Sequence, residues 1–205
     1  MSVPDPVSCQ DQPTLFTPPS KHVLFINMHE KNPTVARAMI AMIATIVIHG
    51  AFAIVTFWSL PAKIPVHFNA DGVADSFAEP SVCSWFGLFF VSVGLGLLMG
   101  AVALSVFNIP SRYLSIPRKK EYLALGEHQK RRLMGVISTH TLIMGIVSIA
   151  LMLCVHISMA LLAHGSIERF PAWVVFAAMF VIIIELVVMI ASFSRKLDSE
   201  IRRMK

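Results

Sequence analysis

The stretch "AMIAMIATIVIHGAFAIVTFWSL", residues 38–60, decides the fold class of this chain. It contains no Lys, Arg, Asp or Glu, and it exceeds the roughly 20 apolar residues that a helix needs to cross the hydrocarbon core of a bilayer. Residues 84–107, 135–162 and 172–193 pass the same test, so the sequence predicts four transmembrane spans. The third apolar run covers 133–163 and is longer than a bilayer needs, which predicts that it tilts or continues into the cytoplasm.

The composition excludes a soluble fold. Of the 205 residues, 56% are hydrophobic and 14% are charged, and the mean hydropathy is +0.70, whereas about 25% of the residues of a soluble domain are charged. We therefore predict an all-α integral membrane protein whose four transmembrane helices form a bundle. Residues 38–193 would form this membrane domain, between a flexible cytoplasmic tail over 1–37 and a basic cytoplasmic tail over 194–205. The three cysteines are too few and too scattered for a disulfide framework.

The distribution of Lys and Arg predicts the orientation of the spans. Fifteen of the 17 basic residues lie before residue 38, in the loop 108–132 or after residue 193. The other two, Lys63 and Arg169, lie in the two remaining loops. Because cytoplasmic loops carry the excess of Lys and Arg, both termini and the loop 108–132 are predicted to be cytoplasmic. The loop that follows residue 60 then faces outward.

The basic residues beside the span ends also account for most of the net charge of +5. Each gains on the order of 1 kcal/mol from anionic lipid headgroups, so we expect the bilayer, and no nucleic acid, to be their partner. A cytoplasmic protein is the alternative partner of the middle loop. The residues of this loop that are predicted to contact headgroups are Arg112, Arg118, Lys119, Lys120, Arg131 and Arg132.

The polar segment "LPAKIPVHFNADGVAD", residues 60–75, separates the first two spans. Pro61 and Pro65 resist helix formation and push the residues before them towards extended geometry. Alternation along the extended segment predicts one side made of Ile64, Val66 and Phe68 and another made of His67, Asn69 and Asp71. The pair Asp71-Gly72 predicts a turn that sends the chain back towards the second span.

This outer loop supports three interpretations. It is a structural cap in which His67 and Asp75 hydrogen-bond to the loop backbone, a recognition surface for an extracytoplasmic peptide or protein, or a metal site made of His67, Asp71 and Asp75. One histidine gives no diagnostic metal-ligand spacing, so we predict no metal and no cofactor. The candidate recognition residues are Pro65, His67, Phe68, Asn69, Asp71, Gly72 and Asp75.

The same segment resembles the signature of a bacterial membrane family, Leu-Pro-x-x-Ile-Pro-x-His-Phe/Trp-Asn/Asp followed by Gly-x-x-Asp. The domain of this family has no assigned function and also forms the N-terminal part of SdpI-type toxin-immunity proteins. The segment "NIPSRYLSIPRKKEYL", residues 108–123, is similar to the segment that follows the second helix in short members. The chain departs from the family at Glu79, where a Lys is usual. The resemblance implies a small multi-pass protein of a bacterial inner membrane, in the role of a receptor, sensor or immunity factor.

Four ionisable side chains lie within the predicted spans: His49, His140, His156 and Glu185. With a rise of about 1.5 Å per residue, His49 and Glu185 fall near the midpoints of their spans. We therefore predict a hydrogen bond between His49 and Glu185, with His140 nearer the cytoplasm and His156 nearer the outside. This pair is either a structural contact between helices or part of a proton or ion path.

Small residues recur every four positions in the second span, at Ser92, Gly96 and Gly100. This spacing allows two helix backbones to approach closely. The contact is predicted to form within the bundle, and a homodimer face is the alternative.

The sequence does not contain the HExxH, GxSxG or glycine-rich phosphate-loop motifs, so we expect no enzymatic activity and no catalytic residues. The leading hypothesis is a membrane protein that binds or senses an extracytoplasmic peptide or protein. The alternatives are a small transporter or proton-translocating subunit that uses the intramembrane His and Glu residues, and a structural accessory subunit.

Overall fold

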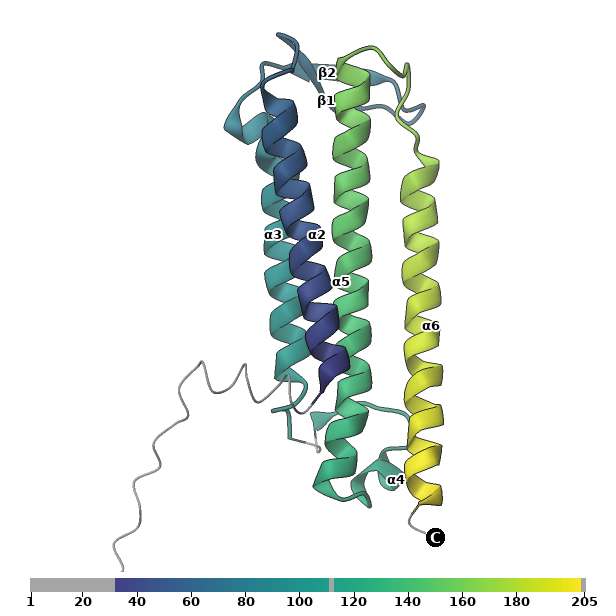
Figure 1. The fold of residues 1–205 in the computed structure, drawn as a ribbon. Helices are drawn as coiled ribbons and strands as arrows, with labels where there is room; N and C mark the ends of the chain where they lie inside the picture. Colours follow the sequence, from purple (N-terminus) through teal and green to yellow (C-terminus); the bar gives the residue numbers. More distant parts are fainter. Residues whose placement is uncertain (1–31, 111–112, 204–205) are drawn as a thin grey trace, which may run out of the picture.

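The computed structural model describes residues 32–110 and 113–203. Most of the predicted tail over 1–37 and the predicted headgroup contact Arg112 lie outside the described residues. The described chain consists mainly of helices, with one small sheet (Figure 1). The long helices are α2 (Pro33–Phe57), α3 (Val82–Ser105), α5 (Glu127–Ala163) and α6 (Trp173–Arg202); the short elements are α4 (Lys119–Leu123), β1 (Ile64–Phe68) and β2 (Ala74–Ala78).

The prediction of four helices long and apolar enough to cross a membrane is confirmed. The helix ends follow local sequence signals. Pro33 suits the first position of α2, because its ring fixes a helical φ and the missing N–H needs no partner there. At the start of α3, the Ser84 N–H donates to Ser81 Oγ and the Ser81 N–H donates to Ser84 Oγ, which forms a capping box.

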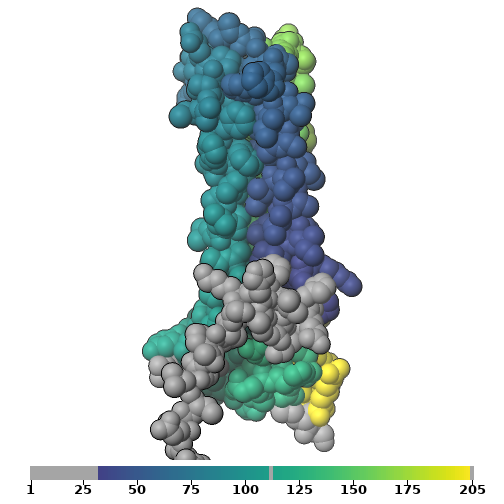
Figure 2. All heavy atoms as spheres, turned by 60° about the vertical axis from the view of Figure 1, so that its left-hand side comes forward, coloured from purple at the N-terminus to yellow at the C-terminus, as the bar shows by residue number. Residues whose placement is uncertain are grey.

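Helix α5 is the centre of the helix packing, because it contacts α2, α3 and α6. Its 37 residues extend about 55 Å, well beyond the roughly 30 Å hydrocarbon thickness, so its length agrees with the long third apolar run. Figure 1 shows that α5 continues past the start of α6 towards the sheet. The two ends of the molecule are called here the hairpin end, which carries β1 and β2, and the α4 end. Figure 2 shows how far apart these ends lie.

The small-residue face of α3 is buried inside the chain. Ser92, Gly96 and Gly100 are buried residues of α3. A Cβ atom at Gly96 would lie 2.6 Å from Ile46 of α2 and 3.5 Å from Ile149 of α5. This face is therefore occupied by the neighbouring helices of the same chain, and a homodimer through it, the alternative raised by the sequence, would require those helices to separate.

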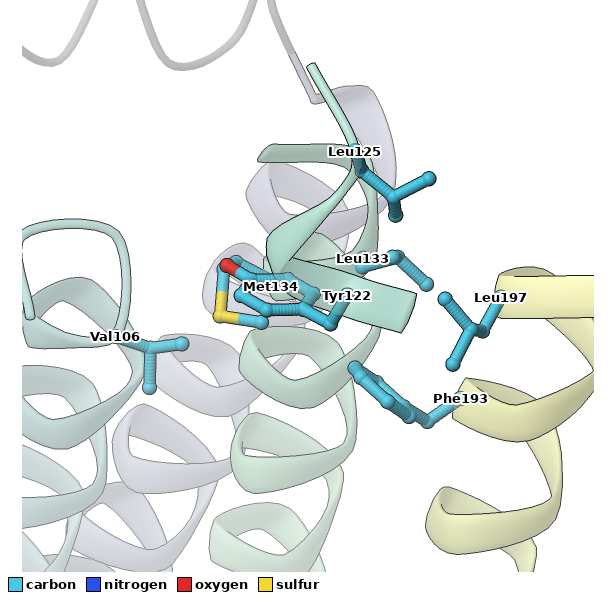
Figure 3. Close-up of a cluster of buried hydrophobic side chains, with 7 residues drawn as sticks. All are labelled: Val106, Tyr122, Leu125, Leu133, Met134, Phe193 and Leu197. Carbon is cyan, nitrogen blue, oxygen red and sulfur yellow. The ribbon is translucent and has the colours of Figure 1, made fainter. Parts of the chain in front are cut away.

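A compact apolar cluster holds the α4 end together (Figure 3). Tyr122 of α4 and Leu125 lie against Leu133 and Met134 of α5 and against side chains of α6. The other members of the cluster are Val106, Phe193 and Leu197. Because the cluster joins four segments, it fixes the loop between α3 and α5 to the ends of three long helices.

The loop between α2 and α3 forms an antiparallel hairpin, in which Ile64 pairs with Ala78 and Phe68 with Ala74. The predicted alternation is wrong at Val66, which is 40% exposed, whereas Ile64 and Pro65 are buried. The reason is an irregular register between Pro65 and His67, which rotates the following residues relative to a regular strand. Phe68 is half-buried, with its ring 5.2 Å from that of Phe170.

The predicted turn at Asp71-Gly72 is present. Gly72 has a φ of 76°, a region that favours glycine, and its N–H donates to the Asn69 carbonyl oxygen. The Asn69 side-chain oxygen accepts hydrogen bonds from the N–H groups of Asp71 and Val73, which explains the need for asparagine at this position. A Cβ at Gly72 would also lie 2.6 Å from the Phe170 carbonyl oxygen, so the turn is held against the α5–α6 loop.

Candidate functional site

The hairpin carries an exposed pair between His67 and Asp75. His67 Nδ1 lies 2.6 Å from Asp75 Oδ1, across the two strands. The two side chains therefore bind each other, in contrast to the predicted hydrogen bonds to the loop backbone. Among residues 32–110 and 113–203, no three His, Cys, Asp or Glu side chains are placed to hold a metal ion, so the metal interpretation of His67, Asp71 and Asp75 has no structural support.

Beneath the hairpin lies a buried cluster made of Ile64, Trp85, Met159 and Ala160. Ile64 of β1 and Trp85 of α3 are fully buried. Trp85 Nε1 donates a hydrogen bond of 2.9 Å to the Ala53 carbonyl oxygen of α2, and its ring centroid lies 4.2 Å from that of His156 of α5. This tryptophan, which sequence reasoning did not single out, therefore connects the hairpin to three helices.

Three polar side chains from α2, α3 and α5 form a buried hydrogen-bonded chain next to Trp85. Ser92 Oγ donates to the Leu88 carbonyl oxygen, so it accepts from His49 Nδ1, which lies 3.0 Å away. With Nδ1 protonated, His49 Nε2 is the acceptor for His156 Nδ1, also at 3.0 Å. His156 Nε2 is then a buried acceptor without a partner in the described part of the chain. We name His49, Ser92 and His156 the histidine chain.

A second intramembrane contact joins α5 to α6. His140 Nδ1 lies 2.6 Å from Glu185 Oε1, and these side chains are 14% and 15% exposed. The predicted hydrogen bond between His49 and Glu185 is therefore wrong. The prediction placed each residue relative to the midpoint of its own span. In the structure, α5 extends beyond α6 at the hairpin end (Figure 1). His140 therefore lies at the level of Glu185, and His156 lies at the level of His49.

The two intramembrane contacts are well separated. His140 and His156 lie 16 residues apart on α5, about 24 Å at the usual helical rise. The buried side chains of α5 between them include Leu142 and Ile149, which pack against Met39, Met42 and Ala103. A proton relay needs neighbouring groups at hydrogen-bond distance, so this arrangement contains no continuous relay among the described residues.

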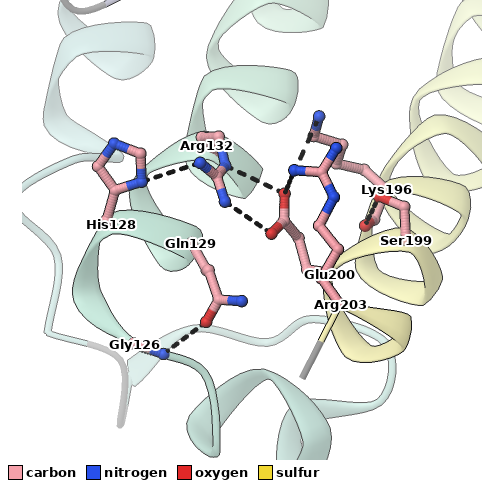
Figure 4. A network of polar contacts seen from close by, with 8 residues as sticks. All are labelled: Gly126, His128, Gln129, Arg132, Lys196, Ser199, Glu200 and Arg203. Carbon is pink, nitrogen blue, oxygen red and sulfur yellow. Dashed lines mark hydrogen bonds and ion pairs between the residues drawn. The ribbon is translucent and has the colours of Figure 1, made fainter. Parts of the chain in front are cut away.

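Ion pairs at the α4 end engage two of the predicted headgroup residues, Arg118 and Arg132, of which Figure 4 shows Arg132. Arg132 forms a bidentate pair with Glu200 of α6, with distances of 3.0 Å and 2.7 Å. Arg118 pairs with Asp198 and Glu121. These contacts show that Arg118 and Arg132 hold protein carboxylates, whereas the headgroup interpretation assigned them to lipid. Lys120 and Arg131 are exposed, and their contact with lipid remains a prediction.

Sequence reasoning did not identify the acidic residues of α6 that form these ion pairs. Glu200 is fully buried although it follows a basic segment, and the alternation of acids and bases in "RKLDSEIRR", residues 195–203, is the signal that could have identified it. Outside the membrane, the hydrogen bonds that the Arg118 guanidinium donates to Asp198 and Glu121 raise the pKa of Arg118 above its usual value. Hydrogen bonds from its own backbone N–H and from Arg118 lower the pKa of Glu121.

Comparison with known proteins gives one match. Residues 44–93 match the family model of a domain of unknown function, DUF1648. The match covers most of α2, the hairpin and the first half of α3, so it includes His49, Trp85 and Ser92, whereas His140, His156 and Glu185 lie outside it. No curated protein and no solved structure matches the chain. The four apolar helices indicate a multi-pass membrane protein, and residues 44–93 are similar to a domain without an assigned function.

Proposed function

We propose that this protein is a non-enzymatic receptor or sensor of a bacterial inner membrane, which recognises an extended peptide or protein segment through the hairpin. The observation that carries this proposal is the open edge of β2. The sheet has two strands, and Asp75, Ser76 and Phe77 of β2 are exposed. An exposed strand edge offers unpaired backbone N–H and C=O groups, to which an extended peptide adds as a further strand.

The side chains around this edge supply specificity. Phe77 is 56% exposed, and Val66 and Val73 are also exposed on the hairpin, beside the His67–Asp75 pair. Aromatic side chains are frequent among the residues that contribute most to binding energy. A peptide with apolar side chains and one charged or hydrogen-bonding group complements this surface. An immunity role against a secreted peptide, as in the SdpI-type proteins that the hairpin sequence resembles, is a narrower form of the same proposal.

The packing beneath the hairpin supports sensing as well as binding. Ile64 belongs to the strand that forms the sheet, and it packs against Trp85, whose ring contacts His156. A ligand that shifts β1 would therefore disturb the contact between Trp85 and the histidine chain. Ile64, Trp85 and His156 pack one against the next, so they connect the hairpin to α2, α3 and α5.

The proposal requires the hairpin to face away from the cytoplasm, which the distribution of Lys and Arg supports. Cys83 lies exposed at the start of α3, close to the hairpin in sequence. In a variant that retains only this cysteine, we expect a membrane-impermeant maleimide to label Cys83 in intact cells. A second variant, with Lys120→Cys in α4 as its only cysteine, should be labelled only after permeabilisation. The opposite labelling pattern would show that the hairpin faces the cytoplasm and would contradict the proposal.

The recognition proposal can be tested with a displayed library of random peptides, selected on the protein in lipid nanodiscs against empty nanodiscs. We expect enriched peptides whose affinity falls at least tenfold on Phe77→Ala. The matched control is Phe90→Ala, because Phe90 is equally exposed, at 56%, but lies on the apolar span α3. Failure to enrich any peptide, or equal losses from both substitutions, would contradict recognition at the hairpin.

A proton- or ion-translocating subunit is the second candidate. It is favoured by the buried His156 Nε2, which has no partner among the described residues, and by the His140–Glu185 pair within the membrane. The apolar packing between these two sites opposes it, because protons would have to cross about 24 Å without polar groups in contact. The receptor proposal needs no such path and is therefore better supported.

A further inference from the structure

A cleft of about 440 Å³ lies at the α4 end, between the start of α2 and the facing sides of α5 and α6. Polar side chains occur among its lining residues, although most of the surface of the cleft is apolar. The polar side chains that line it include Thr34 from α2, Arg132, Thr139 and His140 from α5, and Ser192 and Lys196 from α6. This set supplies hydroxyl, guanidinium, imidazole and ammonium groups, which are hydrogen-bond donors suited to an anion.

Positive side chains outnumber carboxylates around Glu200 within the described residues, and His140, which also lines the cleft, pairs with Glu185. Three cations, Arg132, Lys196 and Arg203, surround the single carboxylate of Glu200 (Figure 4). Arg132 satisfies this carboxylate with two hydrogen bonds. Lys196 Nζ lies 4.0 Å from Glu200 Oε1, which is beyond hydrogen-bond distance. The Lys196 ammonium therefore shares the Glu200 carboxylate at ion-pair distance with Arg132 and Arg203, and the three cations together leave an excess of positive charge beside the cleft.

The depth of the cleft identifies where its ligand comes from. Trp173, which is 70% exposed, is the first residue of α6 at its hairpin end, as expected for a tryptophan at a membrane interface. Ser192 and Lys196 lie about 29 Å and 35 Å along α6 from Trp173, at the usual helical rise. This distance is about one hydrocarbon thickness, so the cleft lies at the headgroup level of the opposite leaflet.

We propose that this cleft is a binding site for the phosphate of one anionic phospholipid of that leaflet. The phosphate lies next to Lys196 and accepts hydrogen bonds from the hydroxyls of Thr34 and Ser192. The acyl chains lie along the exposed apolar side chains of α6, such as Ile184 and Val188. The site differs from general contact between a basic loop and the membrane, because it is a discrete cavity between three helices. It is independent of the recognition proposed for the hairpin.

The test uses the full chain in detergent micelles, titrated with a short-chain fluorescent phosphatidylglycerol. We expect saturable binding of one lipid, and a Kd about five- to tenfold higher after Lys196→Gln, which removes one charge-assisted contact. The matched control is Arg195→Gln, which removes the same charge one residue away, on an exposed position of α6. Its Kd should change less than twofold. Equal effects of both substitutions, or binding that does not saturate, would overturn the proposal.

Two further measurements keep the result interpretable. Ser192→Leu places an apolar side chain in the cleft without a change of charge, and we expect it to weaken binding as much as Lys196→Gln, with an unchanged far-ultraviolet circular dichroism spectrum. Inorganic phosphate at millimolar concentration should displace the lipid only weakly, and phosphatidylcholine should compete at least tenfold less well than phosphatidylglycerol. If inorganic phosphate displaces the lipid at the same concentration as the lipid, the ligand of the site is a soluble anion and the lipid proposal is wrong.

Discussion

Trp85→Ala is expected to destabilise the protein by about 3–5 kcal/mol, the range for the loss of a large aromatic side chain from a packed core. Trp85 is fully buried, donates a hydrogen bond to the Ala53 carbonyl oxygen and contacts the ring of His156. Removing the indole leaves a cavity between α2, α3, α5 and β1, because Ile64, Met159 and Ala160 pack on the same side chain. Reversible unfolding in mixed micelles, followed by circular dichroism at 222 nm, measures the loss.

The chain contains its own controls for this substitution. Trp58 and Trp173 are exposed, so their replacement by alanine should cost less than about 1 kcal/mol in the same assay. Trp85→Phe retains most of the packing and should fall between the two. Hydrogen exchange over residues 64–78 should accelerate in Trp85→Ala, because the hairpin loses its support. A loss equal to that of Trp173→Ala would show that Trp85 does not connect the hairpin to the helices.

The apolar runs were sufficient to predict the four long helices, because a lipid-facing helix needs a continuous stretch of side chains without charge. Hydropathy does not show where a helix stops once it leaves the lipid. Helix α5 begins at Glu127 and α6 continues to Arg202, so both extend well beyond the predicted spans at the α4 end. The hairpin strands were predicted only as an extended segment, since the pairing of Ile64 with Ala78 depends on a turn whose geometry Asn69 and Gly72 determine together.

The intramembrane contacts show what sequence periodicity cannot predict. All four ionisable residues were identified, because a charged or polar group in an apolar run is costly and therefore notable. Their partners depend on the vertical offset of the helices, which no single span reveals. The offset of α5 pairs His156 with His49 and His140 with Glu185. Trp85 was not identified at all, since a tryptophan in an apolar run looks the same whether it faces lipid or the protein interior.

The His140–Glu185 contact leads to the second prediction with a large effect. His140→Leu is expected to destabilise the protein by about 2 kcal/mol, because it leaves the Glu185 carboxyl without its partner in a mostly buried position. Glu185→Leu should cost a similar amount, because it leaves the imidazole without its partner. The measurement is the free energy of unfolding in mixed micelles, with the same assay for each variant.

The double variant His140→Leu/Glu185→Leu should recover most of this loss, because it removes both polar groups and leaves two apolar side chains that lipid and α5 can accommodate. Stability close to that of the original chain would correspond to a coupling energy of about 4 kcal/mol between the two residues, because each single substitution costs about 2 kcal/mol. The control is His49→Leu/Glu185→Leu, whose effects should add, because His49 binds Ser92 and His156. The opposite result would be a recovery of stability in His49→Leu/Glu185→Leu and not in His140→Leu/Glu185→Leu. That result would show that α5 and α6 are offset differently, and that the sequence-based prediction of Glu185 at the level of His49 is correct. Additive effects in both pairs would show that Glu185 has no histidine partner, and that the α5–α6 contact rests on the apolar cluster and the ion pairs of the α4 end.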